Sequence, residues 1–168
     1  MFATTHILAS IVISQHIPSP GWAFLISLLS HFLLDLIPHG DAPLGPWMAA
    51  DPKKRRMALV LGADAFCSIL FLVFFWQNGN LPNLSSLIPA MIGGVLPDFI
   101  WLMSYLFKGC EFLKTKCLFF TATLHRINSF HLHAIHTFFD RKIKKIWVGI
   151  VIQTIFFCGL VYCIASWR

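Results

Sequence analysis

The sequence has few charged residues. Only 12% of its 168 residues are Asp, Glu, Lys or Arg, and only seven are acidic, whereas soluble domains average about 25% charged residues. Apolar residues make up 57% of the chain, above the roughly 45–50% that is usual. Too few polar side chains are present to cover a water-facing globule. The composition therefore excludes an ordinary soluble domain and indicates an integral membrane protein.

The sequence also lacks the patterns that mark common cysteine sites and secretory leaders. Its five cysteines are an odd number and include no C-x2-C pair, so they do not predict a zinc finger. The N-terminus, MFATTHILASIVI, has no positively charged region and no A-x-A cleavage site. We therefore expect this segment to be retained as part of the mature protein.

Lysine and arginine are absent from the long apolar runs. They gather in KKRR (53–56), in 108–116 and in RKIKK (141–145), with Arg126 and Arg168 apart. Membrane proteins concentrate Lys and Arg in cytoplasmic loops. We therefore interpret the net charge of +6 as a sign of membrane topology and predict no nucleic-acid partner.

Hydrophobic runs predict the fold. A spanning helix needs roughly 20 mostly apolar residues, and runs of about that length cover residues 21–38, 57–76, 84–107 and 146–167. A shorter run, 3–17, ends at the turn-forming IPSPG. We predict an all-α integral membrane helical bundle, with four spanning helices plus a short N-terminal helix that spans or is re-entrant. Residues 1–168 form one multi-pass membrane domain, in which KKRR and the basic, His-rich loop 108–145 are cytoplasmic.

Five ionisable side chains lie inside these runs, where each costs several kcal/mol and usually has a function. They are His6, His31, Asp35, Asp64 and Asp98, with His16 set aside because it lies at the opposite end of the run 3–17, where we expect it to be interfacial. With a rise of 1.5 Å per residue, they lie within about 15 Å of the predicted cytoplasmic ends of their helices. We therefore predict that groups from four helices meet in one layer.

The spacing of these residues indicates shared helix faces. His31 and Asp35 are four residues apart and so lie on one side of a helix, as do His6, Ser10 and Ser14. Ordinary packing of small and polar residues explains the serines. Histidine with aspartate is the ligand set of zinc, manganese or iron. A divalent metal site is the favoured interpretation, and a proton relay or packing histidines are the alternatives.

More histidines lie in the predicted cytoplasmic segments. The loop carries His125, His131, His133 and His136. If residues 129–140 are helical, His133 and His136 share a face and can add ligands over the mouth of the bundle. The alternative is a basic amphipathic anchor with solvated histidines. His39 and Asp41 follow Pro38, where they form a polar turn or place His39 beside Asp35.

The motifs resemble a known family. TTHILAS, the glycine-rich GGVLPD (93–98) and the later histidines resemble the small prokaryotic membrane-bound metal-dependent hydrolases. HFLLDLIPH is similar to the H-x3-D helix of the zinc phospholipase C and S1/P1 nuclease group. The resemblance implies a multi-helix protein of the inner membrane. It implies His6, His31, Asp35, Asp98 and one later histidine as metal ligands.

These patterns together predict a metal-dependent hydrolase at the cytoplasmic membrane face. The expected cofactor is a divalent metal, with zinc favoured, and the expected substrate is a phosphoester such as a membrane lipid head group. Asp64 or His39 is the expected general base. The alternative is a non-enzymatic membrane protein, either a degenerate hydrolase or an ion or proton carrier, that uses the same His/Asp cluster.

Overall fold

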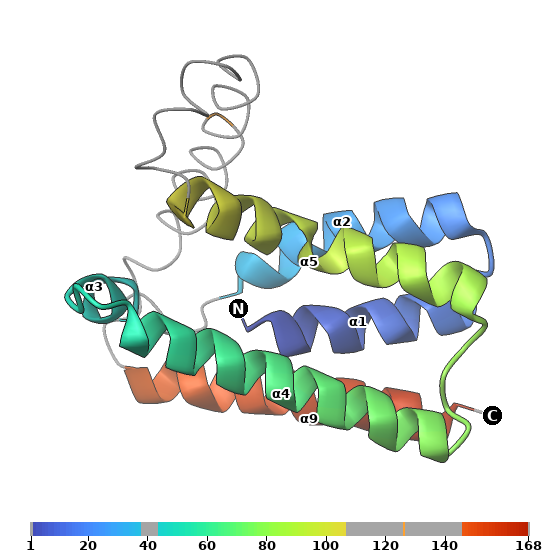
Figure 1. Ribbon diagram of the computed structural model, residues 1–168. Helices are drawn as coiled ribbons and strands as arrows, with labels where there is room; N and C mark the ends of the chain where they lie inside the picture. The colour runs from blue at the N-terminus through green and yellow to red at the C-terminus, as the bar shows by residue number, and fades with distance from the viewer. Residues whose placement is uncertain (1, 38–43, 107–125, 127–145, 168) are drawn as a thin grey trace.

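The computed structural model describes residues 2–37, 44–106, 126 and 146–167, and within these ranges it contains helices and no strand (Figure 1). The predicted all-α fold is therefore confirmed. Five helices are long, and α3 is a short one. Their bounds are α1 Ala3–His16, α2 Pro20–Asp35, α3 Leu44–Ala49, α4 Arg55–Gln77, α5 Leu84–Leu106 and α9 Ile146–Ser166.

Three of these helices, α4, α5 and α9, are long and apolar enough to cross a membrane. Helix α2 begins at Pro20, whose ring fits the first turn of a helix, and its 16 residues cover only about 24 Å. It ends at Asp35, before Ile37, which Pro38 biases away from helical geometry. The predicted count of four spanning helices is not confirmed, because the expected helix 21–38 stops short.

Helix α1 is the centre of the bundle. It contacts α2 and α5 on one side and α4 and α9 on the other (Figure 1). More than half of its 14 residues are buried, whereas α4 and α9 are mostly exposed on their outer faces. Surrounding helices therefore shield α1, which is why it carries more Thr, Ser and His than a lipid-facing helix tolerates.

The two faces of α1 serve different contacts. Leu8 and Ile11 join an apolar core with side chains of α4, α5 and α9. The opposite face presents His6, Ser10 and Ser14, all buried. The predicted polar stripe on this helix is therefore confirmed.

Two adjacent glycines bring α5 close to both α2 and α1. A Cβ atom on Gly93 would overlap the backbone carbonyl oxygen of Phe24 in α2. A Cβ atom on Gly94 would overlap Ser10 Oγ and lie 3.1 Å from the carbonyl oxygen of His6 in α1. Lipid provides little hydrophobic drive for helix association, so small residues that permit close backbone contact supply van der Waals packing instead.

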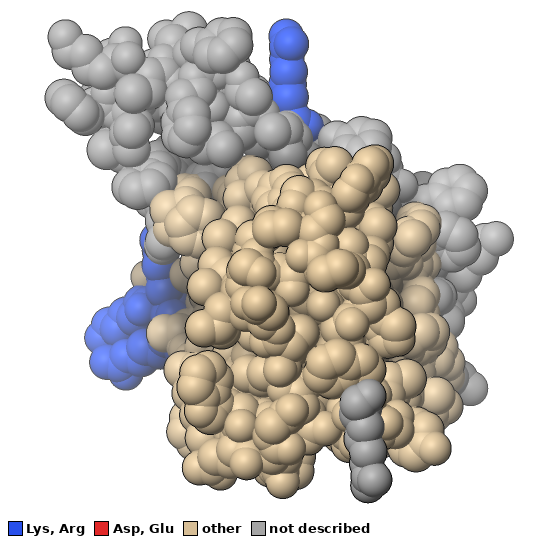
Figure 2. All heavy atoms as spheres, turned by 90° about the vertical axis from the view of Figure 1, so that its right-hand side faces the viewer, with Lys and Arg blue, Asp and Glu red and all other residues tan. Residues whose placement is uncertain are grey.

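The basic residues of the described chain mark one end of the bundle. The Asp51 carboxylate accepts hydrogen bonds from the backbone N–H groups of Lys53 (3.1 Å) and Arg56 (3.0 Å), and the Arg56 N–H lowers the pKa of Asp51. The Arg56 guanidinium lies 4.9 Å from the centre of the Trp47 ring. Figure 2 faces the other end, where the described surface presents no Lys, Arg, Asp or Glu.

We predict that Gly94→Ala lowers the free energy of unfolding by about 1–3 kcal/mol, because the added methyl group overpacks the α1–α5 contact. Unfolding in mixed detergent–SDS micelles, followed by tryptophan fluorescence, measures the change.

The matched control is Gly62→Ala, because Gly62 is an exposed residue of α4 with no atom within 4 Å of an added Cβ. This variant should be neutral or gain up to about 1 kcal/mol from helix propensity. Equal effects of the two substitutions would contradict the close-contact role of Gly94.

Candidate metal centre

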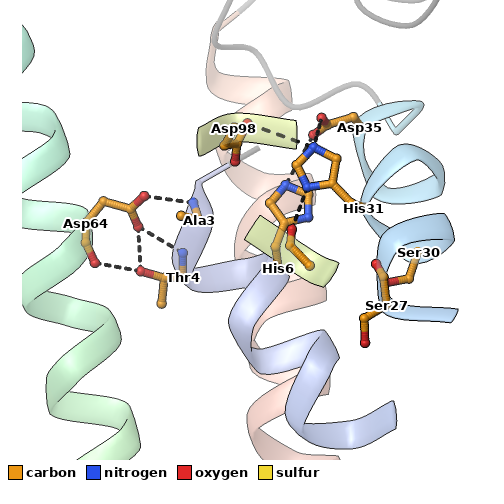
Figure 3. A network of polar contacts seen from close by, with 10 residues as sticks. Ala3, Thr4, His6, Ser27, Ser30, His31, Asp35, Asp64 and Asp98 are labelled. Carbon is orange, nitrogen blue, oxygen red and sulfur yellow. Dashed lines mark hydrogen bonds and ion pairs between the residues drawn. The ribbon is translucent and has the colours of Figure 1, made fainter. Parts of the chain in front are cut away.

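Four side chains from three helices converge near the start of α1. They are His6 of α1, His31 and Asp35 of α2, and Asp98 of α5 (Figure 3). His31 Nε2 lies 3.1 Å from Asp35 Oδ2 and 3.8 Å from Asp98 Oδ1, and His6 Nε2 lies 3.3 Å from Asp35 Oδ1. The predicted meeting of these four residues is therefore present, and we call them the His/Asp cluster.

Helix α2 presents its two members of the cluster from one buried face. Ser27, His31 and Asp35 follow one another at intervals of one helical turn, and each is at most 2% exposed. The exposed residues of α2 are large and apolar, such as Leu29 and Leu33. The helix therefore turns its few polar groups inward, as the sequence spacing predicted.

A backbone carbonyl of α5 orients His31. His31 Nδ1 lies 2.7 Å from the carbonyl oxygen of Gly94. A carbonyl oxygen can only accept a hydrogen bond, so Nδ1 carries the proton. Pro97, which has no N–H, removes one helical hydrogen bond from the turn that contains this carbonyl. Contacts of this kind to the second nitrogen are how proteins fix the tautomer of metal-binding histidines.

This tautomer directs the other nitrogen of His31 toward the carboxylates. In neutral imidazole with a proton on Nδ1, Nε2 bears a lone pair, and Asp35 Oδ2 stands only 3.1 Å away. Two lone pairs at that distance repel each other unless a cation lies between them. The geometry therefore calls for either a proton between the two atoms, carried by Nε2 or by the Asp35 carboxyl, or a bound metal ion.

The ring of His6 brings a second imidazole to the cluster, whose nitrogen could act as a metal ligand. It is 1% exposed; within the described part of the chain its Nδ1 makes no hydrogen bond, and its Nε2 has the 3.3 Å contact with Asp35 Oδ1. The ring stacks on His31, with centroids 3.9 Å apart and planes at 25°. Two protonated imidazoles stacked this closely would repel each other, so the geometry disfavours simultaneous protonation of both rings.

The spacing of the donor atoms suits a small divalent ion. One ligand atom each from His6, His31 and Asp98 lie within 4.8 Å of one another, so these residues can hold a metal ion. Bonds of 2.0–2.1 Å in a tetrahedral zinc site separate neighbouring ligand atoms by about 3.3 Å. The contacts of 3.1, 3.3 and 3.8 Å bracket that value. Two of these contacts involve Asp35, through different oxygens, and Asp35 is not among the three residues whose ligand atoms all lie within 4.8 Å of one another.

The charges of the cluster also suit a divalent ion. Helices α1, α2 and α5 themselves contain no Lys or Arg. Two carboxylates, two neutral imidazoles and one divalent cation sum to zero, and such compensation is what a buried charged group needs.

Exposure within the cluster is uneven. The side chains of His31 and Asp35 are fully buried, whereas the Asp98 side chain is 35% exposed. Asp98 is therefore the most exposed of these three side chains.

Comparison with protein-family models, curated proteins and solved structures found no match for this chain. The resemblance to metal-dependent hydrolases therefore stays a prediction.

Asp64 does not join the cluster, although the sequence predicted that it would. Its carboxylate accepts hydrogen bonds from the N–H groups of Ala3 (2.7 Å) and Thr4 (3.0 Å) and from the Thr4 hydroxyl (Figure 3). Thr4 and His6 are two residues apart, about 200° around the helix, so they face opposite sides of α1. Asp64 lies in about the same layer of the bundle as the cluster, as the sequence predicted. Helix α1 nevertheless separates it from the cluster, where a general base would have to act.

The remaining predicted site residues lie outside the described residues. These are His39 and, of the four histidines His125, His131, His133 and His136 in segment 108–145, the predicted ligands His133 and His136; Asp41, predicted in a polar turn, also lies outside them. Their proposed roles as general base or metal ligands stay predictions. Two contributors to the described site were not anticipated, namely the Gly94 carbonyl and the Thr4 hydroxyl, because no sequence spacing signals a contact between backbone and a distant side chain.

We predict that His31 carries its proton on Nδ1, because the Gly94 carbonyl accepts it. Long-range 1H–15N NMR spectra of detergent-solubilised protein, assigned with His31→Gln, distinguish the two ring nitrogens. A neutral His31 ring with its proton on Nε2 would contradict this orientation of the site.

Proposed function

We propose that the chain is a membrane-embedded, metal-dependent hydrolase that acts on a phosphoester such as a lipid head group. The observation that supports this proposal best is the convergence of His6, His31 and Asp98 at a spacing that could hold one ion, with Asp35 in contact with both histidines. The resemblance of HFLLDLIPH and GGVLPD to hydrolase motifs supports the same reaction class.

Zinc is the metal that we favour. Two imidazoles with one or two carboxylates form a zinc ligand set, and hydrolytic zinc sites keep one position open for water or substrate. Zinc in such a site supplies Lewis acidity and an activated water at neutral pH. The protein contributes the fixed ligand geometry and the exclusion of bulk solvent.

The four protein ligands have different tasks in this proposal. His31, held by Gly94, and Asp35, buried between both histidines, form the rigid part of the site. Asp98 is the part-exposed member, so it borders the position where substrate enters.

A lipid substrate agrees with the surroundings of the cluster. Helices α4, α5 and α9 are long and apolar enough to cross a membrane, and the cluster lies among helices that pack with them. The basic residues Lys53–Arg56 lie at the start of α4, where they can attract the phosphate of an anionic head group.

An ion or proton carrier is the alternative use of the same cluster. It needs mobile polar groups from the cluster to the far end of α1. Ser10 and Ser14 lie on that line, but their hydroxyls donate to the carbonyl oxygens of His6 and Ile11. Gly94 packs against Ser10 without space for another atom. This closed packing favours the hydrolase.

We predict that protein purified in detergent without chelators contains about one zinc ion per chain, and that His31→Ala and Asp35→Ala contain less than about a tenth of that. Loss of a direct ligand should exceed the 10- to 100-fold loss of affinity typical for outer contacts. Inductively coupled plasma mass spectrometry measures the metal.

His16→Ala is the matched control, because His16 lies on α1 but is exposed at the opposite end of the helix. It should retain the metal of the wild type. Wild-type protein that binds no divalent metal even after incubation with zinc would overturn the proposed site.

We further predict that the protein in liposomes hydrolyses a phospholipid or a model phosphodiester, and that a chelator abolishes and zinc restores the reaction. Asp98→Asn should lower kcat at least about 100-fold, since loss of a direct metal ligand should exceed the 10- to 100-fold losses typical for outer contacts. Phosphate or head-group release measures turnover. Activity that is unaffected both by the chelator and by Asp98→Asn would exclude this mechanism.

A further inference from the structure

The first residue of α1 lies beside the middle of α4 rather than beside its first residue. Ala3 and Thr4 bind Asp64, which lies nine residues after Arg55, the first residue of α4. At 1.5 Å per residue, this places the start of α1 about 13 Å along α4. Figure 1 agrees, because α4 and α9 both extend past the start of α1. The first turn of α1 therefore lies within the length of the apolar helices rather than at their ends.

A helix that begins inside a bilayer has a specific problem. Its first N–H groups have no partner within the helix, and the bilayer core offers no water to bind them. The residue before α1, Phe2, makes no side-chain capping bond. Another part of the protein must satisfy these donors.

Asp64 solves this problem from the neighbouring helix. Its two carboxylate oxygens accept from the N–H groups of Ala3 and Thr4, and the Thr4 hydroxyl adds contacts to Asp64 and to Ser68 Oγ (2.9 Å). Its negative charge also lies at the positive end of the α1 dipole. A carboxylate is the side chain best suited to both tasks.

His6 depends on this cap. It is the fourth residue of α1, so it lies in the turn that the cap closes, on the opposite face from Thr4. Any fraying or axial shift of the first turn would move His6 Nε2 from its position 3.3 Å from Asp35 Oδ1.

We propose that Asp64 is a positioning residue that acts through the first turn of α1 to hold His6 at the metal centre. The inference rests on the proposed metal site for its functional consequence. It replaces the role of general base, because Asp64 reaches the His/Asp cluster only through α1.

The test compares three variants of the full-length protein. Asp64→Ala removes both acceptors, Asp64→Asn retains one acceptor of similar size, and Ser68→Ala removes a neighbouring hydroxyl that does not bind the N–H groups of α1. Zinc affinity should fall about 10- to 100-fold in Asp64→Ala, as for other residues that orient a ligand. It should fall less in Asp64→Asn and stay within about 3-fold in Ser68→Ala.

A spectroscopic measurement separates positioning from a general loss of stability. Cobalt substituted for zinc reports ligand geometry through its visible absorption, and this spectrum should change in Asp64→Ala, partly recover in Asp64→Asn and stay unchanged in Ser68→Ala. Unchanged zinc affinity and an unchanged cobalt spectrum in a folded Asp64→Ala protein would overturn the inference.

A metal-free measurement keeps this test independent of the proposed function. In wild-type protein, the amide protons of Ala3 and Thr4 should exchange slowly, and the His6 ring should give one sharp set of NMR signals. In Asp64→Asn, or in Asp64→Ala where it folds, exchange should accelerate and the His6 signals should shift. If wild-type protein binds no metal, the proposed function fails, and these signals alone decide whether Asp64 positions His6. Unchanged signals would reject it.

Discussion

The burial of the Asp35 carboxylate beside two imidazoles among apolar helices is the constraint on which the bundle depends. Asp35 is 2% exposed and contacts both His6 and His31, and a charge held there costs several kcal/mol unless a cation compensates it. α1 lies at the centre because its polar face has to be enclosed. The cluster needs contributions from three helices because no single helix face can surround an ion.

Close helix contact follows from the same constraint. Hydrogen bonds and dispersion hold helices together in lipid, so the backbones around the cluster must approach closely. Gly93 and Gly94 permit α5 to contact α2 and α1 at one level, and the same approach brings the Gly94 carbonyl to His31. Packing and chemistry are thus coupled: a methyl group on Gly94 would disturb both the helix contact and the orientation of a ligand.

Much of the fold and part of the site could be predicted from composition and spacing. The lengths of the apolar runs predicted the bounds of α4, α5 and α9 to within a few residues. A long uncharged run in lipid can satisfy its backbone polar groups by forming a helix. The four-residue interval between His31 and Asp35 placed both on one face, since helical periodicity is fixed. The length of α2 was predicted less well, because its end depends on a local turn before Pro38 rather than on apolar content.

The sequence by itself determined that His6, His31, Asp35, Asp64 and Asp98 lie at similar depth, because depth along a helix follows from a constant rise per residue. Only the tertiary structure decided which of them meet. The rotation of each helix about its axis depends on its neighbours, and it turns His6 toward α2 and α5 while Thr4 faces Asp64 on α4. Four of the five residues thereby form one cluster. The fifth caps the helix that carries His6.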